Sequence, residues 1–143
     1  MPLLIELKDQ TERPGGTLGP LERAVAEDLA GYDGPAAVMS FHPVMVTNLA
    51  KFAPDVPRGI TGQLYDPDDV GEEIAEALND YSAFDGTGSC FISHDWRDLD
   101  MPAVARLKKR RVPILCWTIR SPEEERIARA VADNVTFERY LPA

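Results

Sequence analysis

The chain has 143 residues, which is enough for one domain with a hydrophobic core. Its 44% hydrophobic and 27% charged residues are ordinary for a globular protein and argue against wholesale disorder. A formal net charge of −9 argues against a nucleic-acid partner, which needs a basic face to neutralise phosphates.

Strands and helices are predicted to alternate from the first residues onward. The first strand covers residues 3–8, because aliphatic side chains at Leu3, Ile5 and Leu7 take every second position. Glu6 and Lys8 share its opposite face. A helix is predicted after a polar loop, and the glycines of GYDGP end it. The apolar stripe of this helix consists of Leu18, Leu21, Val25 and Leu29.

The middle of the chain continues this alternation. A strand over 36–41 precedes a helix that begins near Pro43. A weaker strand covers 57–66, and the strand after it covers 90–96. Between these two strands a helix is predicted from the spacing of Val70, Ile74, Leu78 and Tyr81.

The last third of the chain adds two helices and two strands. A helix over 101–111 precedes a strand over 113–119. Ser121 and Pro122 then begin a helix whose buried face is expected to carry Ile127 and Val131. The segment NVTFERYL closes the chain as a short strand.

About six strands thus alternate with five helices, which predicts right-handed crossovers and a parallel sheet. Two architectures agree with this order: an open doubly wound sheet and an arc of a (β/α)₈ barrel. The segment PGGTLG lies in a long loop and not in a tight strand-to-helix turn, so it is not a dinucleotide fingerprint. The barrel arc is therefore favoured.

The cysteines and the apolar runs of the sequence limit which metal sites and which cellular compartment we expect. Cys90 and Cys116 have no CxxC spacing and no companion histidine cluster, so we expect buried free thiols and no zinc site. No apolar run approaches the roughly 20 residues of a membrane helix, and no signal-peptide pattern is visible. We expect a cytoplasmic protein without a membrane span.

Functional groups of parallel α/β proteins gather at the carboxyl ends of the strands. In this sequence those ends carry Glu6, Lys8, Ser40, Phe41, His42, Tyr65, Asp66, Ser93, His94, Asp95, Trp117, Thr118, Arg120 and Glu138. Glu6 and Lys8 can act together on a metal or a phosphate, since the acid offers an oxygen ligand and the base a positive charge. The alternative is a solvated ion pair on an edge strand.

The histidines and the basic run have ordinary alternatives as well. His42 precedes a helix-starting proline, which is typical of a capping or loop residue. His94 can be a general acid or base, or a hydrogen-bonded loop residue. The run RLKKRR (106–111) ends a helix, where positive charge complements the helix dipole, and we expect a solvated helix face.

The strand motifs together resemble the glycerophosphodiester phosphodiesterase family of metal-dependent barrels. LLIELK resembles its Glu-x-Lys strand, MSFHP its Ser-Phe strand end, and PDVPRG the segment before the next strand. ILCWTIRSPEEE resembles its Trp-Thr strand with the following helix, and NVTFERYLP its closing strand. The resemblance implies an incomplete (β/α)₈ TIM barrel of the PLC-like phosphodiesterase type, with about six parallel strands and alternating helices.

The resemblance also implies roles for particular residues. Glu6 would be a ligand to a divalent cation, calcium or magnesium, and Lys8 would stabilise charge on the phosphate during catalysis. Trp117 and Phe41 would wall the substrate pocket. The family reaction hydrolyses a glycerophosphodiester, a small molecule of glycerophospholipid metabolism, to glycerol 3-phosphate and an alcohol.

The chain also departs from this family. The family's His-Arg-Gly strand and second histidine, its general acid and base, are not present in the sequence. Arg120 stands where an asparagine is commoner. We therefore expect residues 1–143 to be a single domain that begins at the third barrel unit, with two units missing from a barrel of about 250 residues. Metal binding is expected to be weak or absent, and the isolated chain inactive.

Three hypotheses follow from the match and its departures. In the first hypothesis, the chain is the C-terminal part of a phosphodiesterase. The complementing N-terminal fragment would then be encoded upstream or by a separate gene. Alternatively, it is a non-catalytic barrel remnant that binds a partner or self-associates through open strand edges. The third hypothesis is an unrelated open α/β binding domain.

Overall fold

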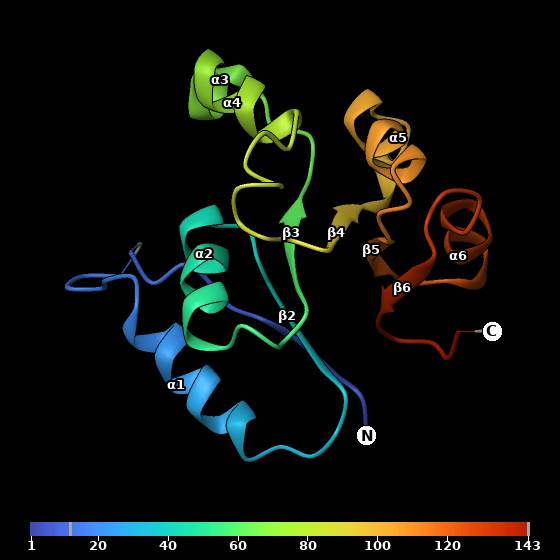
Figure 1. Ribbon diagram of the computed structural model, residues 1–143. Coiled ribbons are helices and arrows are strands. Elements are labelled where there is room, and N and C mark those ends of the chain that lie inside the picture. Colours follow the sequence, from blue (N-terminus) through green and yellow to red (C-terminus); the bar gives the residue numbers. More distant parts are fainter. Residues whose placement is uncertain (12, 143) are drawn as a thin grey trace. The chain divides into compact units, whose positions relative to one another are not determined.

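The computed structural model describes residues 1–11 and 13–142, and strands and helices alternate along them (Figure 1). Its first elements are β1 (Leu3–Glu6), α1 (Pro20–Ala30), β2 (Ala36–Ser40), α2 (Pro43–Phe52) and β3 (Arg58–Gly62). The next are α3 (Pro67–Val70), α4 (Glu72–Asn79), β4 (Phe91–Asp95) and the 3₁₀ turn η1 (Trp96–Asp98). The last are α5 (Pro102–Lys109), β5 (Ile114–Ile119), α6 (Pro122–Ala128) and β6 (Asn134–Phe137).

The chain forms two compact units. Unit 1 contains residues 1–61 and 83–90, and unit 2 contains residues 62–82 and 91–143. In unit 1, β1 pairs with β2 and β2 with β3, both in parallel. In unit 2, β4 pairs with β5 and β5 with β6, again in parallel. The predicted parallel α/β architecture, with strands neighbouring one another in chain order, is confirmed.

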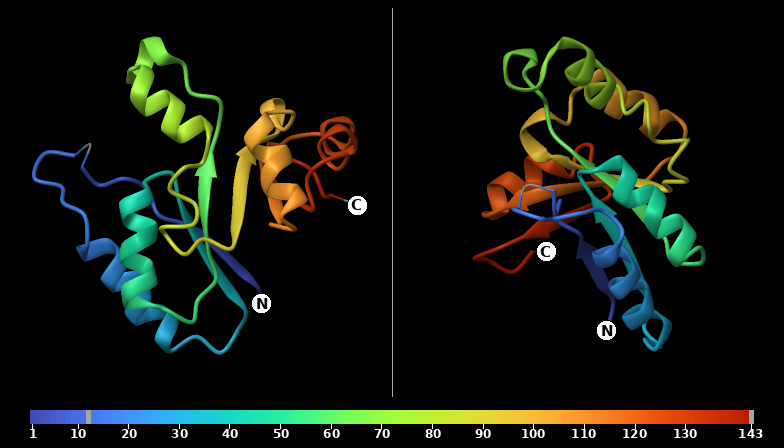
Figure 2. Two further views of the ribbon diagram at one scale, coloured as in Figure 1. Left: turned by 45° about the horizontal axis from the view of Figure 1, so that its top comes forward. Right: turned by 90° about the vertical axis from the view of Figure 1, so that its left-hand side faces the viewer.

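The core of unit 1 lies between its strands and helices α1 and α2, which lie side by side (Figure 2). Leu7, Val38, Met45 and Leu49 are buried in it. The predicted helical stripe packs against these four residues. Burial of this apolar surface, at roughly 25 cal/mol per Å², is the main term that stabilises the unit.

In unit 2, buried aliphatic side chains come from α5 and from the strands. Val104 and Leu107 are buried on α5, and Ile92, Ile114 and Ile119 are buried on β4 and β5. The basic run at the end of α5 faces solvent, as predicted. Arg106 there pairs with Asp80, and Lys108 pairs with Asp133.

The single helix predicted across residues 70–81 is wrong. Two helices replace it, because Gly71 has a φ of 89° and separates α3 from α4. L-residues with a side chain rarely adopt this backbone conformation, whereas glycine does so readily. Tyr81, which the pattern placed on the helix, lies beyond the end of α4 at Asn79.

Two further expectations about burial are corrected. Ile127 is 48% exposed, and α6 instead buries Glu125 and Ala128. The thiols of Cys90 and Cys116 are both free, as expected, but only Cys116 is buried. Cys90 is exposed because it directly precedes β4 and is not part of that strand.

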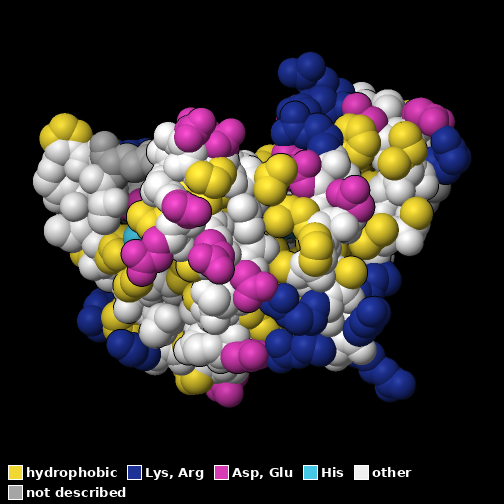
Figure 3. Space-filling view, turned by 90° about the horizontal axis from the view of Figure 1, so that it is seen from above, with side chains coloured by type: hydrophobic (Ala, Val, Ile, Leu, Met, Phe, Trp, Pro, Cys, Tyr) yellow, Lys and Arg dark blue, Asp and Glu magenta, His cyan; other side chains and the backbone are white. Residues whose placement is uncertain are grey.

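The face in Figure 3 carries both acidic and basic side chains, and histidine is almost hidden there. Among the described residues, no helix combines the length and the apolar character that crossing a membrane requires. The charged side chains on the face in Figure 3 agree with the 27% of charged residues in the sequence.

Candidate functional site

Three of the predicted site residues meet in unit 1. Glu6 is the last residue of β1, and Lys8 follows it closely enough to form an ion pair with its carboxylate. The side chain of Glu6 is 25% exposed and that of Lys8 is 71% exposed. The ammonium of Lys8 lies 5.8 Å from the centroid of the Phe41 ring, within the range of a cation–π contact. The three residues thus form one charged group with an aromatic wall.

Ser40 fixes the backbone of this group. Its hydroxyl, fully buried at the end of β2, donates to the carbonyl of Leu7 at 2.8 Å. The same hydroxyl oxygen accepts a hydrogen bond from the backbone N–H of His42 at 3.1 Å. Because Leu7 stands between Glu6 and Lys8, this hydrogen bond fixes the backbone from which both side chains project.

His42 begins α2 as its N-cap residue. Its Nδ1 accepts a hydrogen bond from the N–H of Val44 at 3.2 Å, so the capping prediction is confirmed. Asp9 lies on the loop after β1, where the backbone N–H and hydroxyl of Thr11 hydrogen-bond its carboxylate. These bonds, with a smaller contribution from His42, lower the pKa of Asp9. The carboxylate of Asp9 is therefore ionised and held by the loop after β1.

The donor set for a metal ion is small. In residues 1–11 and 13–142 no three His, Cys, Asp or Glu side chains lie close enough together to hold an ion. Glu6 supplies one carboxylate, and an oxygen of that carboxylate already meets Lys8. Calcium takes six to eight oxygen ligands and magnesium takes six, so the described residues do not by themselves fit either cation.

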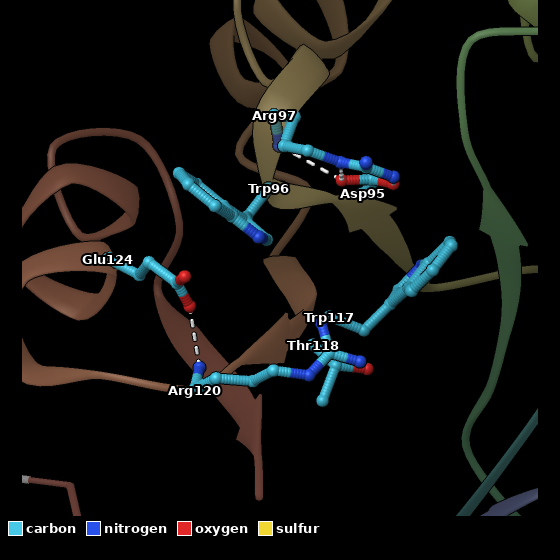
Figure 4. Close-up of a pocket in the computed structure, with 7 residues that line it drawn as sticks. All are labelled: Asp95, Trp96, Arg97, Trp117, Thr118, Arg120 and Glu124. Carbon is cyan, nitrogen blue, oxygen red and sulfur yellow. Dashed lines mark hydrogen bonds and ion pairs between the residues drawn. The ribbon is translucent and has the colours of Figure 1, made fainter.

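Trp117, the fourth predicted site residue, belongs to unit 2 and lines a cavity there. Its indole N–H donates to the carbonyl of Ser93 at 3.2 Å. The register pairs Asp95 with Trp117, so the carboxyl ends of β4 and β5 meet at the cavity. The cavity has a volume of about 330 Å³ and is lined by Asp95, Trp96, Arg97, Trp117, Thr118, Arg120 and Glu124 (Figure 4).

Asp95 and Arg97 form a two-pronged ion pair on one wall of the cavity. Arg97 Nε lies 2.9 Å from Oδ1 of Asp95, and Nη2 binds Oδ2. Burial by itself raises the pKa of Asp95, but the hydrogen bonds and the charge of Arg97 outweigh it and lower the pKa. The carboxylate therefore stays ionised, with both oxygens turned toward Arg97.

Arg120 occupies another wall. Its Nε donates to Oε1 of Glu138 at 2.6 Å. Its backbone N–H donates to Oε2 of Glu124, also at 2.6 Å (Figure 4). Thus both carboxylates near Arg120 accept hydrogen bonds from that same residue.

His94 lies inside β4 and is completely buried, so it is not the loop residue that one alternative predicted. Its Nδ1 is 2.6 Å from the hydroxyl of Tyr81, and its Nε2 has no hydrogen-bond partner among the described residues. Burial lowers the pKa of His94, and the nearby charges of Asp98 and Asp95 only partly oppose this. Burial also raises the pKa of Tyr81. This pair is therefore neutral near pH 7 and closed to solvent.

Tyr65 and Asp66, two more of the predicted strand-end residues, line a second cavity in unit 2. Its volume is about 570 Å³, and Asn79, Arg97 and Asp98 contribute to its wall. Asp66 caps α3 by accepting a hydrogen bond from a backbone N–H, so it has a structural role. The sequence analysis missed Trp96, Arg97 and Glu124 of the smaller cavity. They lie directly after β4 or in the first turn of α6, so extending the strand-end rule by a few residues finds them.

Comparison with known proteins gives matches in structure alone. No family model matches the sequence, and the search of curated proteins found no match to it. A protein described as a glycerophosphoryl diester phosphodiesterase from Silicibacter pomeroyi DSS-3 matches 94% of this chain with a TM-score of 0.69 and 23% identity. An Oleispira antarctica phosphodiesterase, solved with the product sn-glycerol-3-phosphate, matches 82% with a TM-score of 0.61 and 16% identity. A Parabacteroides distasonis glycerophosphodiester phosphodiesterase matches 94% with a TM-score of 0.61 and 13% identity.

These solved structures are longer than the region that matches. The chain spans 45%, 46% and 52% of their respective lengths. Six strands alternating with helices, and the match over most of this chain, confirm the predicted fold class. The chain has the incomplete (β/α)₈ barrel fold of the glycerophosphodiester phosphodiesterases, over about half the length of those proteins.

Proposed function

We propose that this chain carries part of the site of a phosphoric diester hydrolase that acts on glycerophosphodiesters. The observation that carries the proposal is the likeness of 82% of the chain to a phosphodiesterase solved with sn-glycerol-3-phosphate. The meeting of Glu6, Lys8 and Phe41 at the end of β1 supports it. In this reaction the oxygen of a water molecule would bond to phosphorus as the phosphorus–oxygen bond to the alcohol breaks, and the departing alkoxide would take up a proton, giving glycerol 3-phosphate and an alcohol.

In this proposal Lys8 binds the phosphate of the ligand. Its ammonium is mostly exposed, so it can turn from Glu6 toward a phosphate oxygen without a large desolvation cost. Negative charge on the phosphate oxygens during hydrolysis would be stabilised by this cation. Phe41 would contact the apolar surface of a ligand bound to Lys8, and Trp117 would contact a ligand that binds in unit 2.

Glu6 would hold Lys8 in place and offer one carboxylate to a divalent cation. Because the described residues contain no group of three metal-binding side chains, no step of the proposal depends on a metal. A proton donor for the leaving alcohol is also not assigned. His94 is buried and His42 caps α2, so neither is placed to protonate an alcohol.

Titration with sn-glycerol 3-phosphate, followed by calorimetry, tests the assignment of Lys8. We expect Lys8→Ala to weaken binding by about tenfold, because a charge-assisted hydrogen bond is lost. Lys51→Ala is the matched control, since Lys51 is also an exposed lysine of unit 1 but lies in the last turn of α2. Equal affinities for wild type and Lys8→Ala would contradict the assignment.

An activity assay tests the expectation that the isolated chain does not turn over. A glycerophosphodiester is incubated with the chain and calcium or magnesium, and release of glycerol 3-phosphate is measured. We expect no release above the level without protein. Hydrolysis that a chelator abolishes would show that the described residues do assemble a working metal site.

A further inference from the structure

The cavity at the ends of β4 and β5 contains donors that the proposed function does not use. Arg97 and Arg120 both line it, together with Trp96 and Trp117. In Figure 4 the nitrogen end of the Trp96 indole is directed toward the middle of the group of side chains. The cavity thus combines two guanidinium groups with two flat aromatic walls.

The carboxylates near this cavity are already hydrogen-bonded. Asp95 uses both oxygens on Arg97. Glu124 accepts from the backbone N–H of Arg120, and Glu138 accepts from its Nε. The lining contains two acidic and two basic residues, so their formal charges cancel. The hydrogen-bond donors that remain then decide which ligand fits.

The remaining side-chain donors include the guanidinium groups, the indole of Trp96 and the hydroxyl of Thr118, which also lines the cavity. Within the described part of the chain, Nη1 of Arg97, both Nη atoms of Arg120 and Nε1 of Trp96 have no hydrogen-bond partner. Guanidinium groups bind carboxylates and phosphates through planar pairs of N–H donors.

We propose that this cavity is an oxyanion subsite, which binds a carboxylate or phosphate group through Arg97, Arg120 and Trp96. The biological role of this subsite rests on the proposed function. It deepens that function because Trp117, which we propose to contact a ligand, lines the same cavity. The ligand of this subsite would be a small molecule that carries a carboxylate or phosphate group. The subsite itself is a property of unit 2 and is tested without any turnover.

The tryptophans provide a direct readout. The chain has two, Trp96 and Trp117, and both line this cavity. Tryptophan fluorescence is therefore measured during titration with inorganic phosphate, acetate and uncharged glycerol, at constant ionic strength set with sodium chloride. We expect a saturable change with phosphate and with acetate, and none with glycerol.

Substitutions of arginine assign the binding to named residues. Arg120→Gln should weaken phosphate binding by about tenfold. Arg126→Gln is the matched control, because Arg126 is likewise exposed and paired with one glutamate but does not line the cavity. Arg97→Lys keeps a cation beside Asp95 and loses the planar fork, so it should bind phosphate more weakly while remaining folded.

Three results would overturn the subsite. One is a fluorescence change that does not saturate, and another is a change that chloride reproduces. The third is an unchanged phosphate affinity in folded Arg120→Gln. These failures are distinct from failure of the proposed function, because Lys8 is not part of this cavity and no hydrolysis is measured.

Discussion

The hydroxyl of Ser40 donates a hydrogen bond of 2.8 Å to the carbonyl of Leu7, and this bond joins the end of β2 to the backbone between Glu6 and Lys8. The bond is fully buried, and the neighbouring carbonyl groups of β1 are held by pairing with β2. A buried serine of β2 thus anchors the backbone that carries the charged group of unit 1.

Removal of this hydroxyl should destabilise unit 1. Ser40→Ala leaves the buried carbonyl of Leu7 without its donor, which costs about 1–3 kcal/mol. Urea denaturation followed by circular dichroism measures the loss. Ser82→Ala is the control, because the hydroxyl of Ser82 is exposed and its loss should change stability by less than about 0.5 kcal/mol. Equal stabilities of Ser40→Ala and wild type would remove Ser40 from its positioning role.

A buried carboxylate on α1 supports a second prediction. Glu22 is fully buried, and it accepts hydrogen bonds from the N–H of Gly19 at 2.8 Å and from the amide of Asn48 at 2.9 Å. Glu22→Gln keeps the shape but can satisfy only one of these two donors, so we expect a loss of about 1–3 kcal/mol in urea denaturation. The exposed Glu27 of the same helix gives the control Glu27→Gln. If both variants lose the same stability, the hydrogen bonds of Glu22 are not the cause.

Burial of His94 predicts a pH dependence of stability. The folded pKa of His94 is lowered, so between that pKa and about 6.5 the unfolded chain binds a proton that the folded chain does not. The stabilisation is therefore complete above pH 6.5 and is lost as pH falls below it, by at most about 1.4 kcal/mol per pH unit. Urea midpoints between pH 8 and pH 5 measure this slope.

The chain offers its own control for this slope. It has two histidines, so His94→Gln should flatten the dependence, whereas His42→Asn should keep it. Asparagine is a good N-cap residue and so preserves the start of α2. A slope that persists unchanged in His94→Gln would assign the pH dependence to other groups.

Among the described residues β1 pairs with β2 alone, and we expect chains of this length to self-associate through its other edge. The N–H of Leu3 donates to the carbonyl of Pro35, just before β2, and the N–H of Leu7 donates to the carbonyl of Met39 in β2. Because alternate residues of a strand face opposite sides, the N–H of Leu4 points away from β2. Leu4 is also 41% exposed. We expect a mass above 15.8 kDa in size-exclusion chromatography with light scattering, and a lower mass for Leu4→Pro, which removes the N–H. A stable monomer of the wild type at high concentration would contradict this.

Much of the fold could be predicted from local patterns. Alternation at residues 3–8 and the apolar stripe of α1 both locate their elements, since each depends only on side chains close together in sequence. The break at Gly71 was missed because apolar spacing continued across it, although its backbone conformation does not. The exposure of Ile127 was also missed, because α6 packs through Glu125 and Ala128.

The candidate site was predictable to a similar extent. The strand-end rule listed Asp95, Trp117, Thr118 and Arg120 among other residues, and the structure brings these four to one cavity, because parallel register places the ends of β4 and β5 side by side. The roles of His94 and Arg97 required tertiary information. His94 is hydrogen-bonded to Tyr81, which lies thirteen positions earlier in the sequence. Arg97 is paired with the carboxylate of Asp95, and the burial of that carboxylate is not visible in the sequence.

Two-dimensional NMR of the backbone amides tests most directly whether the phosphate of a ligand binds at Lys8. The chain is titrated with sn-glycerol 3-phosphate, and the amides whose signals shift locate the bound molecule. We expect saturable shifts at the amides of Glu6, Leu7, Lys8 and Phe41, which are lost in Lys8→Ala and retained in Lys51→Ala. Binding that leaves these four amides unmoved, or no binding at all, would contradict the proposed binding at Lys8.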